Sequence, residues 1–203
     1  MESYKLGIDI SRHNGDIDWV QLTPDKSGIS FIIHKATEGS TYQDPKFVQN
    51  WQAASAAGFQ CGGYHFLRFG TSEPEAQMEN FLAQLNKVGE ITTNNIIALD
   101  VEKEEGTADI VTNTLQNCVH YLKNRNITPY IYTTQSFWNK YVPNTPEIIK
   151  ACPLWIARWR DKEPSPSELP SGWKEWKIWQ YSSTGRCVGI KGDVDLNRMI
   201  IND

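Results

Sequence analysis

Short apolar runs recur along the chain, separated by longer segments in which apolar residues repeat every three or four positions. The short runs predict buried strands, and the longer repeats predict amphipathic helices. On this pattern we expect strands at residues 5–10, 31–37, 61–67, 96–101 and 129–134.

Helices are predicted between these strands. One covers residues 47–57 and ends before Gly58, a residue type favoured just past a helix C-terminus. Two more cover residues 74–88 and 108–123, and each has an apolar face. These faces consist of Met78, Phe81, Leu82, Leu85 and Val88 in the first, and Val111, Leu115, Cys118, Val119 and Leu122 in the second.

The pattern changes after Thr134. Residues 154–158, 177–181 and 194–196 still resemble strands, but the Pro- and Gly-rich segments between them contain no convincing long helix. Strands that alternate with helices imply a parallel sheet with right-handed crossovers. Five strand-and-helix units followed by three strands supply the eight strands that close a barrel. We therefore predict an α/β fold with one domain over residues 1–203, an irregular TIM-like barrel with few helices near its end.

Charge and composition exclude several classes of protein. The chain has 20 Lys and Arg against 24 Asp and Glu, a formal charge of −4, which argues against nucleic acid as a partner. The longest apolar runs, such as residues 96–99, are far shorter than the roughly 18 residues of a membrane span. The first residues lack the basic start and long apolar segment of a signal peptide, so we expect none.

The four cysteines lie at least 34 positions apart and form no C-x-x-C pair. Neither a zinc site nor a disulfide scaffold is indicated, and mostly buried thiols are expected. They are Cys61, Cys118, Cys152 and Cys187.

Aromatic residues are unusually frequent, with eight Trp, eight Tyr and seven Phe. Trp and Tyr combine a flat apolar face with a polar edge, which suits stacking on sugar rings. Some of these rings must fill the core, so their abundance favours a carbohydrate groove without proving one.

The candidate chemistry is acidic. Functional residues of such barrels lie where strands end, and the polar residues at those points are Asp9, Asp100, Glu102 and Asp195. Asp100 and Glu102 are two apart on one strand, so both face the same side with Cα atoms about 6.6 Å apart. Two neighbouring carboxyl groups with limited access to solvent do not both ionise easily. One of them then keeps its proton and serves as a general acid, while the other stays charged. Cleavage of a glycosidic bond requires such a pair.

Acidic residues in this arrangement also serve structural or metal-binding roles. An arbitrary Asp-x-Glu more often caps a helix or forms a surface salt bridge. Oxygen ligands also suit Mg or Ca, although no calcium-type loop is present and we expect no metal. The sequence contains no G-x-S-x-G elbow, P-loop, G-x-G-x-x-G or H-E-x-x-H, and the four His are scattered.

Nine ordered segments together resemble glycoside hydrolase family 25, the Ch-type lysozymes. They span nearly the whole chain and keep all four acidic positions. The segments are residues 7–11 (GIDIS), 15–19 (GDIDW), 31–39 (FIIHKATEG), 63–66 (GYHF), 98–102 (ALDVE), 130–133 (YIYT), 154–159 (LWIARW), 179–182 (WQYS) and 194–197 (VDLN).

This resemblance implies an N-acetylmuramidase that cuts the β-1,4 bond between N-acetylmuramic acid and N-acetylglucosamine, on a barrel of five strand-helix units and three extra strands. It implies that Glu102 protonates the leaving oxygen, that Asp100 is the partner carboxylate, and that Asp9 and Asp195 are the other acids of the groove. It also implies retention, with the substrate's 2-acetamido group as internal nucleophile and Asp100 stabilising the oxazolinium.

For sugar contacts we nominate aromatic and polar residues of the matching segments: Tyr64, Tyr132, Trp155, Trp159 and Gln180, with Lys35 as a further polar contact. Any one of these aromatic residues could equally belong to the core. Glu38 and Arg158 either lie beside the site or pair with each other.

The expected partner is the glycan strand of peptidoglycan, bound by a monomer without a cofactor, at the bacterial cell wall outside the cell or in the periplasm. Two alternatives stay open: a non-catalytic glycan-binding relative, and a chitin-type N-acetylglucosaminidase, whose D-x-x-D-x-D-x-E signature is absent. A phage endolysin, an autolysin and an antibacterial effector all remain compatible with the sequence.

Overall fold

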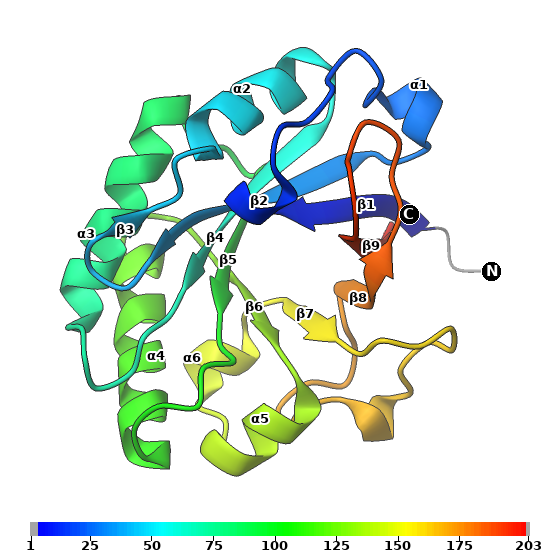
Figure 1. The fold of residues 1–203 in the computed structure, drawn as a ribbon. Coiled ribbons are helices and arrows are strands. Elements are labelled where there is room, and N and C mark those ends of the chain that lie inside the picture. The colour runs from blue at the N-terminus through cyan, green and yellow to red at the C-terminus, as the bar shows by residue number, and fades with distance from the viewer. Residues whose placement is uncertain (1–3, 202–203) are drawn as a thin grey trace.

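The computed structural model describes residues 4–201, and within this range eight strands close into a barrel (Figure 1). Neighbours around the barrel pair in the order β1-β9-β8-β7-β6-β5-β4-β2, and β2 pairs again with β1. The strands are β1 Tyr4–Ile10, β2 Phe31–Glu38, β4 Gln60–Phe66, β5 Ile96–Asp100, β6 Tyr130–Thr133, β7 Leu154–Ala157, β8 Ile178–Gly185 and β9 Val194–Ile200. A ninth strand, β3 Tyr42–Gln43, extends the edge of β2.

The sheet is parallel from β1 through β2 to β8, and β9 runs antiparallel to both of its neighbours, β8 and β1. The last strand, β9, therefore forms a hairpin with β8 and lies between β8 and β1. The predicted barrel is confirmed, although the sequence pattern did not reveal the direction of this strand.

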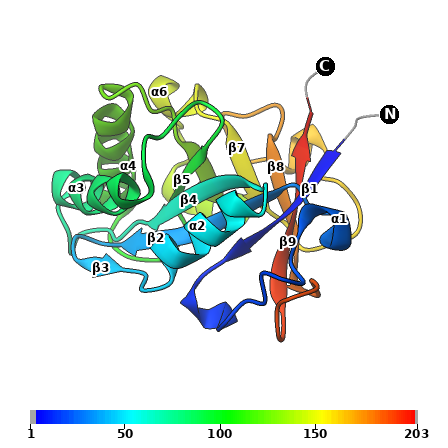
Figure 2. The same ribbon diagram turned by 90° about the horizontal axis from the view of Figure 1, so that it is seen from above.

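Helices cover one side of the barrel, and β8, β9 and β1 have only short helices beside them (Figures 1 and 2). The helices are α1 Pro24–Ser27, α2 Phe47–Ala56, α3 Pro74–Leu85, α4 Ala108–Lys123, α5 Gln135–Tyr141 and α6 Glu147–Lys150, with 3-10 turns at Arg12–Asn14, Asn86–Val88 and Pro166–Glu168. None of the helices in the described part of the chain has the length and apolar composition needed to cross a membrane.

The three long helices lie where the apolar periodicity placed them. The sequence pattern missed three short helices. One is α1, and the other two, α5 and α6, connect β6 to β7. With seven and four residues, they are too short to show a periodic apolar face. The third helix lies over residues 108–123 as predicted, and its Thr107 accepts a hydrogen bond from the Ile110 N–H as an N-cap.

Successive residues of each strand alternate between the inside of the barrel and the layer under the helices. On β5, Ile96 and Ala98 pack inside, whereas Ile97 and Leu99 join the larger core beneath the helices. Gly7 lies on β1 where a Cβ atom would come within 2.4 Å of the Phe31 ring. Side chains therefore fill the interior of the barrel, and polar residues follow them at the carboxyl ends of the strands.

Candidate active site

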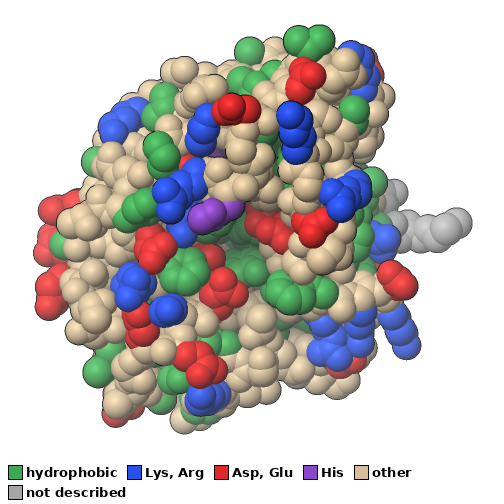
Figure 3. All heavy atoms as spheres, in the orientation of Figure 1, with side chains coloured by type: hydrophobic (Ala, Val, Ile, Leu, Met, Phe, Trp, Pro, Cys, Tyr) green, Lys and Arg blue, Asp and Glu red, His purple; other side chains and the backbone are tan. Residues whose placement is uncertain are grey.

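A pocket of about 300 Å³ opens at the carboxyl end of the barrel strands, and the space-filling view shows a hollow there with acidic side chains around it (Figure 3). The pocket is lined by Asp9, Tyr64, Asp100, Glu102, Tyr132, Trp155, Trp159, Gln180, Ser183 and Asp195. The structure thus brings together all four acids and five of the six residues nominated for sugar contacts.

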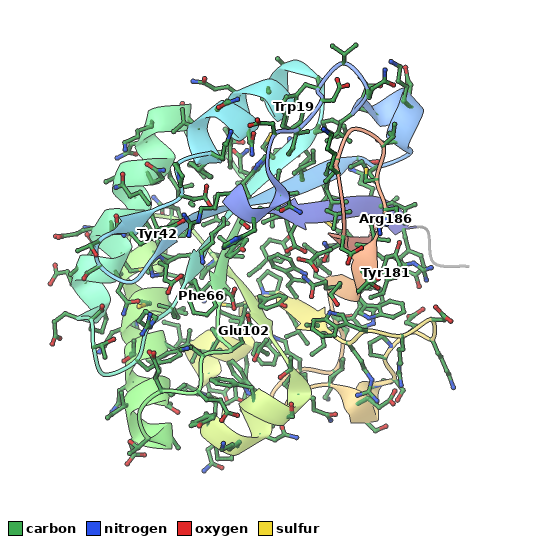
Figure 4. The ribbon with its side chains drawn as sticks, viewed as in Figure 1. Trp19, Tyr42, Phe66, Glu102, Tyr181 and Arg186 are labelled. Atoms are coloured by element: carbon green, nitrogen blue, oxygen red, sulfur yellow. The ribbon has the colours of Figure 1, made fainter. Side chains whose placement is uncertain are left out.

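The alternation of the strands explains how these residues meet. Asp9 and Asp100 continue the inward-facing rows of β1 and β5, so they follow the apolar interior directly. Val101 keeps the chain extended beyond β5, because its N–H donates to the Tyr132 carbonyl at 2.9 Å. Glu102 therefore returns to the same side as Asp100, as the Asp-x-Glu spacing predicts, and lies beside the opening (Figure 4).

Asp9 is buried and accepts two hydrogen bonds on one oxygen. The Gln180 amide donates to Asp9 Oδ2 at 2.8 Å, and the Asn197 amide donates to the same atom at 2.7 Å. Amide donors favour the ionised form of a carboxyl group, and they oppose the burial that raises the pKa of Asp9.

Both amides are oriented by aromatic donors. The Trp155 indole N–H donates to Asn197 Oδ1 at 2.8 Å, and the Trp159 indole N–H donates to Gln180 Oε1 at 2.9 Å. An indole N–H can only donate, so each amide must turn its oxygen toward a tryptophan and its NH₂ group toward Asp9. This chain of hydrogen bonds links an exposed ring, Trp159, to a buried carboxylate.

Asp195 faces Asp9 directly across the antiparallel pair β1 and β9. Burial, the charge of Asp9 and a hydrogen bond between the two carboxyl groups raise the pKa of Asp195 to about 8. The two amide donors act on Asp9 alone, so of the two carboxyl groups Asp195 is the one whose protonated form is more strongly favoured.

Asp100 and Glu102 form the second acidic pair. Asp100 is buried, its Oδ1 has no hydrogen-bond partner, and burial followed by the charge of Glu102 raises its pKa well above the usual range. Glu102 is more exposed, and surrounding protein and Asp9 raise its pKa, opposed by Lys35. Neither residue caps a helix or forms a salt bridge within residues 4–201, so neither structural role of an Asp-x-Glu pair applies.

Lys35 lies beside this pocket and does not line it. Its Nζ donates to Glu38 at 2.8 Å and sits 4.9 Å from the centre of the Phe66 ring. The positive charge still lowers the pKa of both Asp100 and Glu102. Lys35 is thus outside the lining of this pocket, and its role as a sugar contact stays a prediction.

The suggested pairing of Glu38 with Arg158 is wrong. Glu38 pairs with Lys35 and with Arg68, at 2.8 and 3.1 Å. Arg158 instead donates to Glu168 at 2.7 Å. The two residues belong to separate ion-pair groups, one at the end of β2 and the other directly after β7.

No group of three or more His, Cys, Asp and Glu side chains in the described part of the chain is arranged to hold a metal ion. The four cysteines are free thiols, and Cys61, Cys118 and Cys152 are buried.

A sequence profile of the family described as "Glycosyl hydrolases family 25" matches residues 8–190 of the chain. The chain belongs to glycosyl hydrolase family 25. The matched range contains nine of the ten pocket residues, from Asp9 to Ser183.

Relatives in family 25 include Lysozyme M1 of Streptomyces globisporus, 35% identical over 202 residues, and the autolytic lysozyme of Clostridium acetobutylicum, 31% identical over 192 residues. These matches cover 95% and 94% of this chain, which spans only 66% and 54% of the relatives' own lengths. The crystal structure of a bacterial lysozyme from Streptomyces coelicolor superposes with a TM-score of 0.85 at 33% identity, covering 97% of this chain and 92% of that one.

Sequence reasoning missed two residues of this family 25 site. Asn197 lies two positions after Asp195 on β9, a spacing that places both on one face, and this alternation was the available signal. Ser183 lies in β8 near a register shift of the β8–β9 pair, so no regular alternation predicts that it reaches the pocket.

Proposed function

We propose that this family 25 hydrolase is an N-acetylmuramidase that cleaves the β-1,4 bond between N-acetylmuramic acid and N-acetylglucosamine in peptidoglycan. The observation that carries the proposal is the pocket itself, in which two pairs of carboxyl groups lie among aromatic rings that suit pyranose sugars. Lysozyme relatives over most of the chain support the same substrate class. The site of action is then the bacterial cell wall.

In this proposal Glu102 is the general acid. It is the more exposed member of its pair, so it can reach a glycosidic oxygen entering from solvent. Its raised pKa keeps a larger protonated fraction available near neutral pH than an ordinary glutamate would have.

Asp100 is proposed to hold the substrate's 2-acetamido group. Its unpartnered Oδ1 is an acceptor aimed at no protein donor, and the acetamido N–H is a donor of matching character. A hydrogen bond from that N–H favours the ionised form of Asp100, which moves the proton of the pair toward Glu102 when substrate binds. The charged carboxylate then stabilises the oxazolinium that forms when the acetamido oxygen attacks the anomeric carbon.

Asp9 is the fixed negative charge of the site. Because two amide donors hold it ionised, it contributes to the potential that favours a developing cation without itself taking up a proton. The lining residues run from Asp9 to Asp195 and build one pocket, so we also propose that residues 1–203 act as one catalytic domain.

Digestion of purified peptidoglycan followed by mass spectrometry of the new reducing ends tests the proposal. N-acetylmuramic acid at those ends is expected. N-acetylglucosamine would instead identify a glucosaminidase, and binding without any new reducing end would identify a glycan-binding protein.

A further inference from the structure

A second pocket of about 300 Å³ adjoins the candidate active site, and the side chain of Trp159 lines both. The Trp159 side chain is 62% exposed and its position is held by the hydrogen bond to Gln180. The second pocket is lined by Thr134, Gln135, Ser136, Ile156, Ala157, Arg158, Trp159 and Glu168, which belong to the carboxyl ends of β6 and β7 and the segments that follow. We name it the Arg158 pocket.

One cation and one anion line the Arg158 pocket, Arg158 and Glu168, and the ion-pair group to which they belong contains a second cation, Arg160. Glu168 pairs with both Arg158, at 2.7 Å, and Arg160, at 2.6 Å, so one carboxylate serves two guanidinium groups. Arg160 also donates to the backbone carbonyls of Lys162 and Glu163. Four of its five N–H donors are therefore engaged, against two for Arg158, and it does not line the pocket.

Arg158 has donors to spare. A guanidinium group carries five N–H donors. Those of Arg158 have two acceptors, Glu168 at 2.7 Å and the Gln135 amide oxygen at 3.4 Å. The remaining donors match a planar carboxylate, which guanidinium binds in a bidentate manner.

The rest of the Arg158 pocket is partly apolar, with Ile156, Ala157 and the ring of Trp159 in its lining. Polar side chains line it as well, and the hydroxyl groups of Thr134 and Ser136 lie 3.2 Å from one another. A short chain with small side chains and a free carboxylate fits such a wall better than a sugar ring, because every pyranose hydroxyl facing Ile156 or Ala157 would lose its hydrogen bonds to water.

We propose that the Arg158 pocket binds a carboxylate of the peptide carried by the muramic acid residue of the substrate. This inference rests on the proposed muramidase function and specifies what the enzyme recognises beyond the cleaved bond. The backbone of N-acetylated sugars is uncharged once its lactyl group is amide-linked, so the free carboxylates of this polymer belong to its peptides. The two pockets share one aromatic wall, which places the peptide beside the sugar that bears it.

The test compares two substrates prepared from the same cell wall: glycan strands with their peptides, and strands from which an amidase has removed the peptides. The readout is the ratio of kcat/KM on the first substrate to kcat/KM on the second, because a variant that is partly inactive or unfolded changes both values equally. Arg158→Gln is the test variant, and Arg160→Gln is the matched control within the same ion-pair group.

Arg158→Gln is expected to lower this ratio about tenfold, as loss of a hydrogen bond between charged groups does, while Arg160→Gln leaves the ratio unchanged. If Arg158→Gln lowers activity equally on both substrates, the pocket contacts the glycan or only supports the fold, and the proposal is overturned. A wild-type protein that cuts neither substrate overturns the muramidase function and this inference together.

Discussion

Asp9 and Asp195 lie directly opposite each other on β1 and β9, and their carboxyl groups share a hydrogen bond. The two amides that donate to Asp9 act on only one member of this pair. The pair is therefore asymmetric, because these donors favour the ionised form of Asp9 and leave Asp195 as the group that more readily holds the proton.

This asymmetry predicts how stability depends on pH. The pKa of Asp195 is raised to about 8 in the folded state, whereas an unfolded aspartate titrates near 3.8. Between these values the folded state holds a proton that the unfolded chain releases, so this contribution to stability declines as pH rises and is lost above about pH 8. Asp195→Asn removes the titrating group. As the pH rises from 5 to 8, the melting temperature of this variant should therefore fall less than that of the wild type.

Asp193→Asn is the matched control for this experiment, because Asp193 lies two residues away and is exposed. Its melting temperature should follow the wild-type curve. Parallel curves for the wild type and Asp195→Asn would contradict the assignment of the proton to Asp195.

Glu102→Gln should lower the rate of peptidoglycan cleavage by about 10²- to 10⁴-fold, because the amide keeps the shape of the side chain but delivers no proton. Release of reducing ends measures the rate, and circular dichroism checks the fold. Glu104→Gln, an exposed residue of the same loop that pairs with Lys140 at 3.1 Å, should retain activity. A Glu102→Gln rate above about half that of the wild type would remove this residue from the role of acid.

Asp100→Asn should severely reduce turnover and should weaken the binding of a cyclic thiazoline that mimics the oxazolinium, because the carboxylate that meets its positive charge is gone. Calorimetric titration of the inhibitor measures the difference, with the exposed α4 variant Asp109→Asn as a control of unchanged affinity. A sugar trapped covalently on Asp100 by a slow fluorosugar substrate would instead identify Asp100 as the nucleophile.

His34 and His65 are both buried, but only His65 has hydrogen-bond partners. Its ring nitrogens lie 2.7 Å from the Thr37 hydroxyl and 3.2 Å from the Gln77 amide oxygen, whereas neither ring nitrogen of His34 has a partner. His65→Leu leaves the buried Thr37 hydroxyl without its partner, whereas the Gln77 oxygen keeps the Arg68 N–H, and the change should cost about 1–3 kcal/mol in the free energy of unfolding. His34→Leu leaves no such group without a partner, so urea unfolding at pH 7 should give a clearly smaller loss.

Burial of His34 also makes the stability of the protein depend on acidic pH. Burial lowers the pKa of His34 to about 3. Below pH 6.5 the unfolded chain therefore binds a proton at this residue that the folded protein does not bind. The free energy of unfolding consequently declines as the pH falls. His34→Leu should therefore lose less stability than the wild type between pH 7 and pH 4. Equal losses would mean that His34 is not buried in its neutral form.

Activity should be insensitive to EDTA. The carboxyl groups of the site have other tasks, since Asp9 already accepts two amide N–H groups on one oxygen and shares a hydrogen bond with Asp195. The rate of reducing-end release with and without chelator measures this. Loss of activity that one divalent cation restores would show that a metal is required.

Much of the fold follows from the sequence because it depends on local periodicity. Neighbouring residues alone define an apolar run as long as a β-strand, and they also define the 3.6-residue repeat of the three long helices. The structure places these elements within a few positions of the prediction. The same alternation brings Asp100 and Glu102 to one side, since that relationship spans only three residues.

Only the tertiary structure decided which hydrogen-bond donors surround each acidic residue of the site. Asn197 and Gln180 reach Asp9 from 188 and 171 positions away, because β9 enters the barrel antiparallel and sets its register against β1. Which carboxyl group stays ionised depends on which donors surround it and how deeply it is buried, and neither is a property of a single segment. The sequence by itself identified the four acids and the aromatic residues of this pocket, and only barrel closure determined which donors surround each acid.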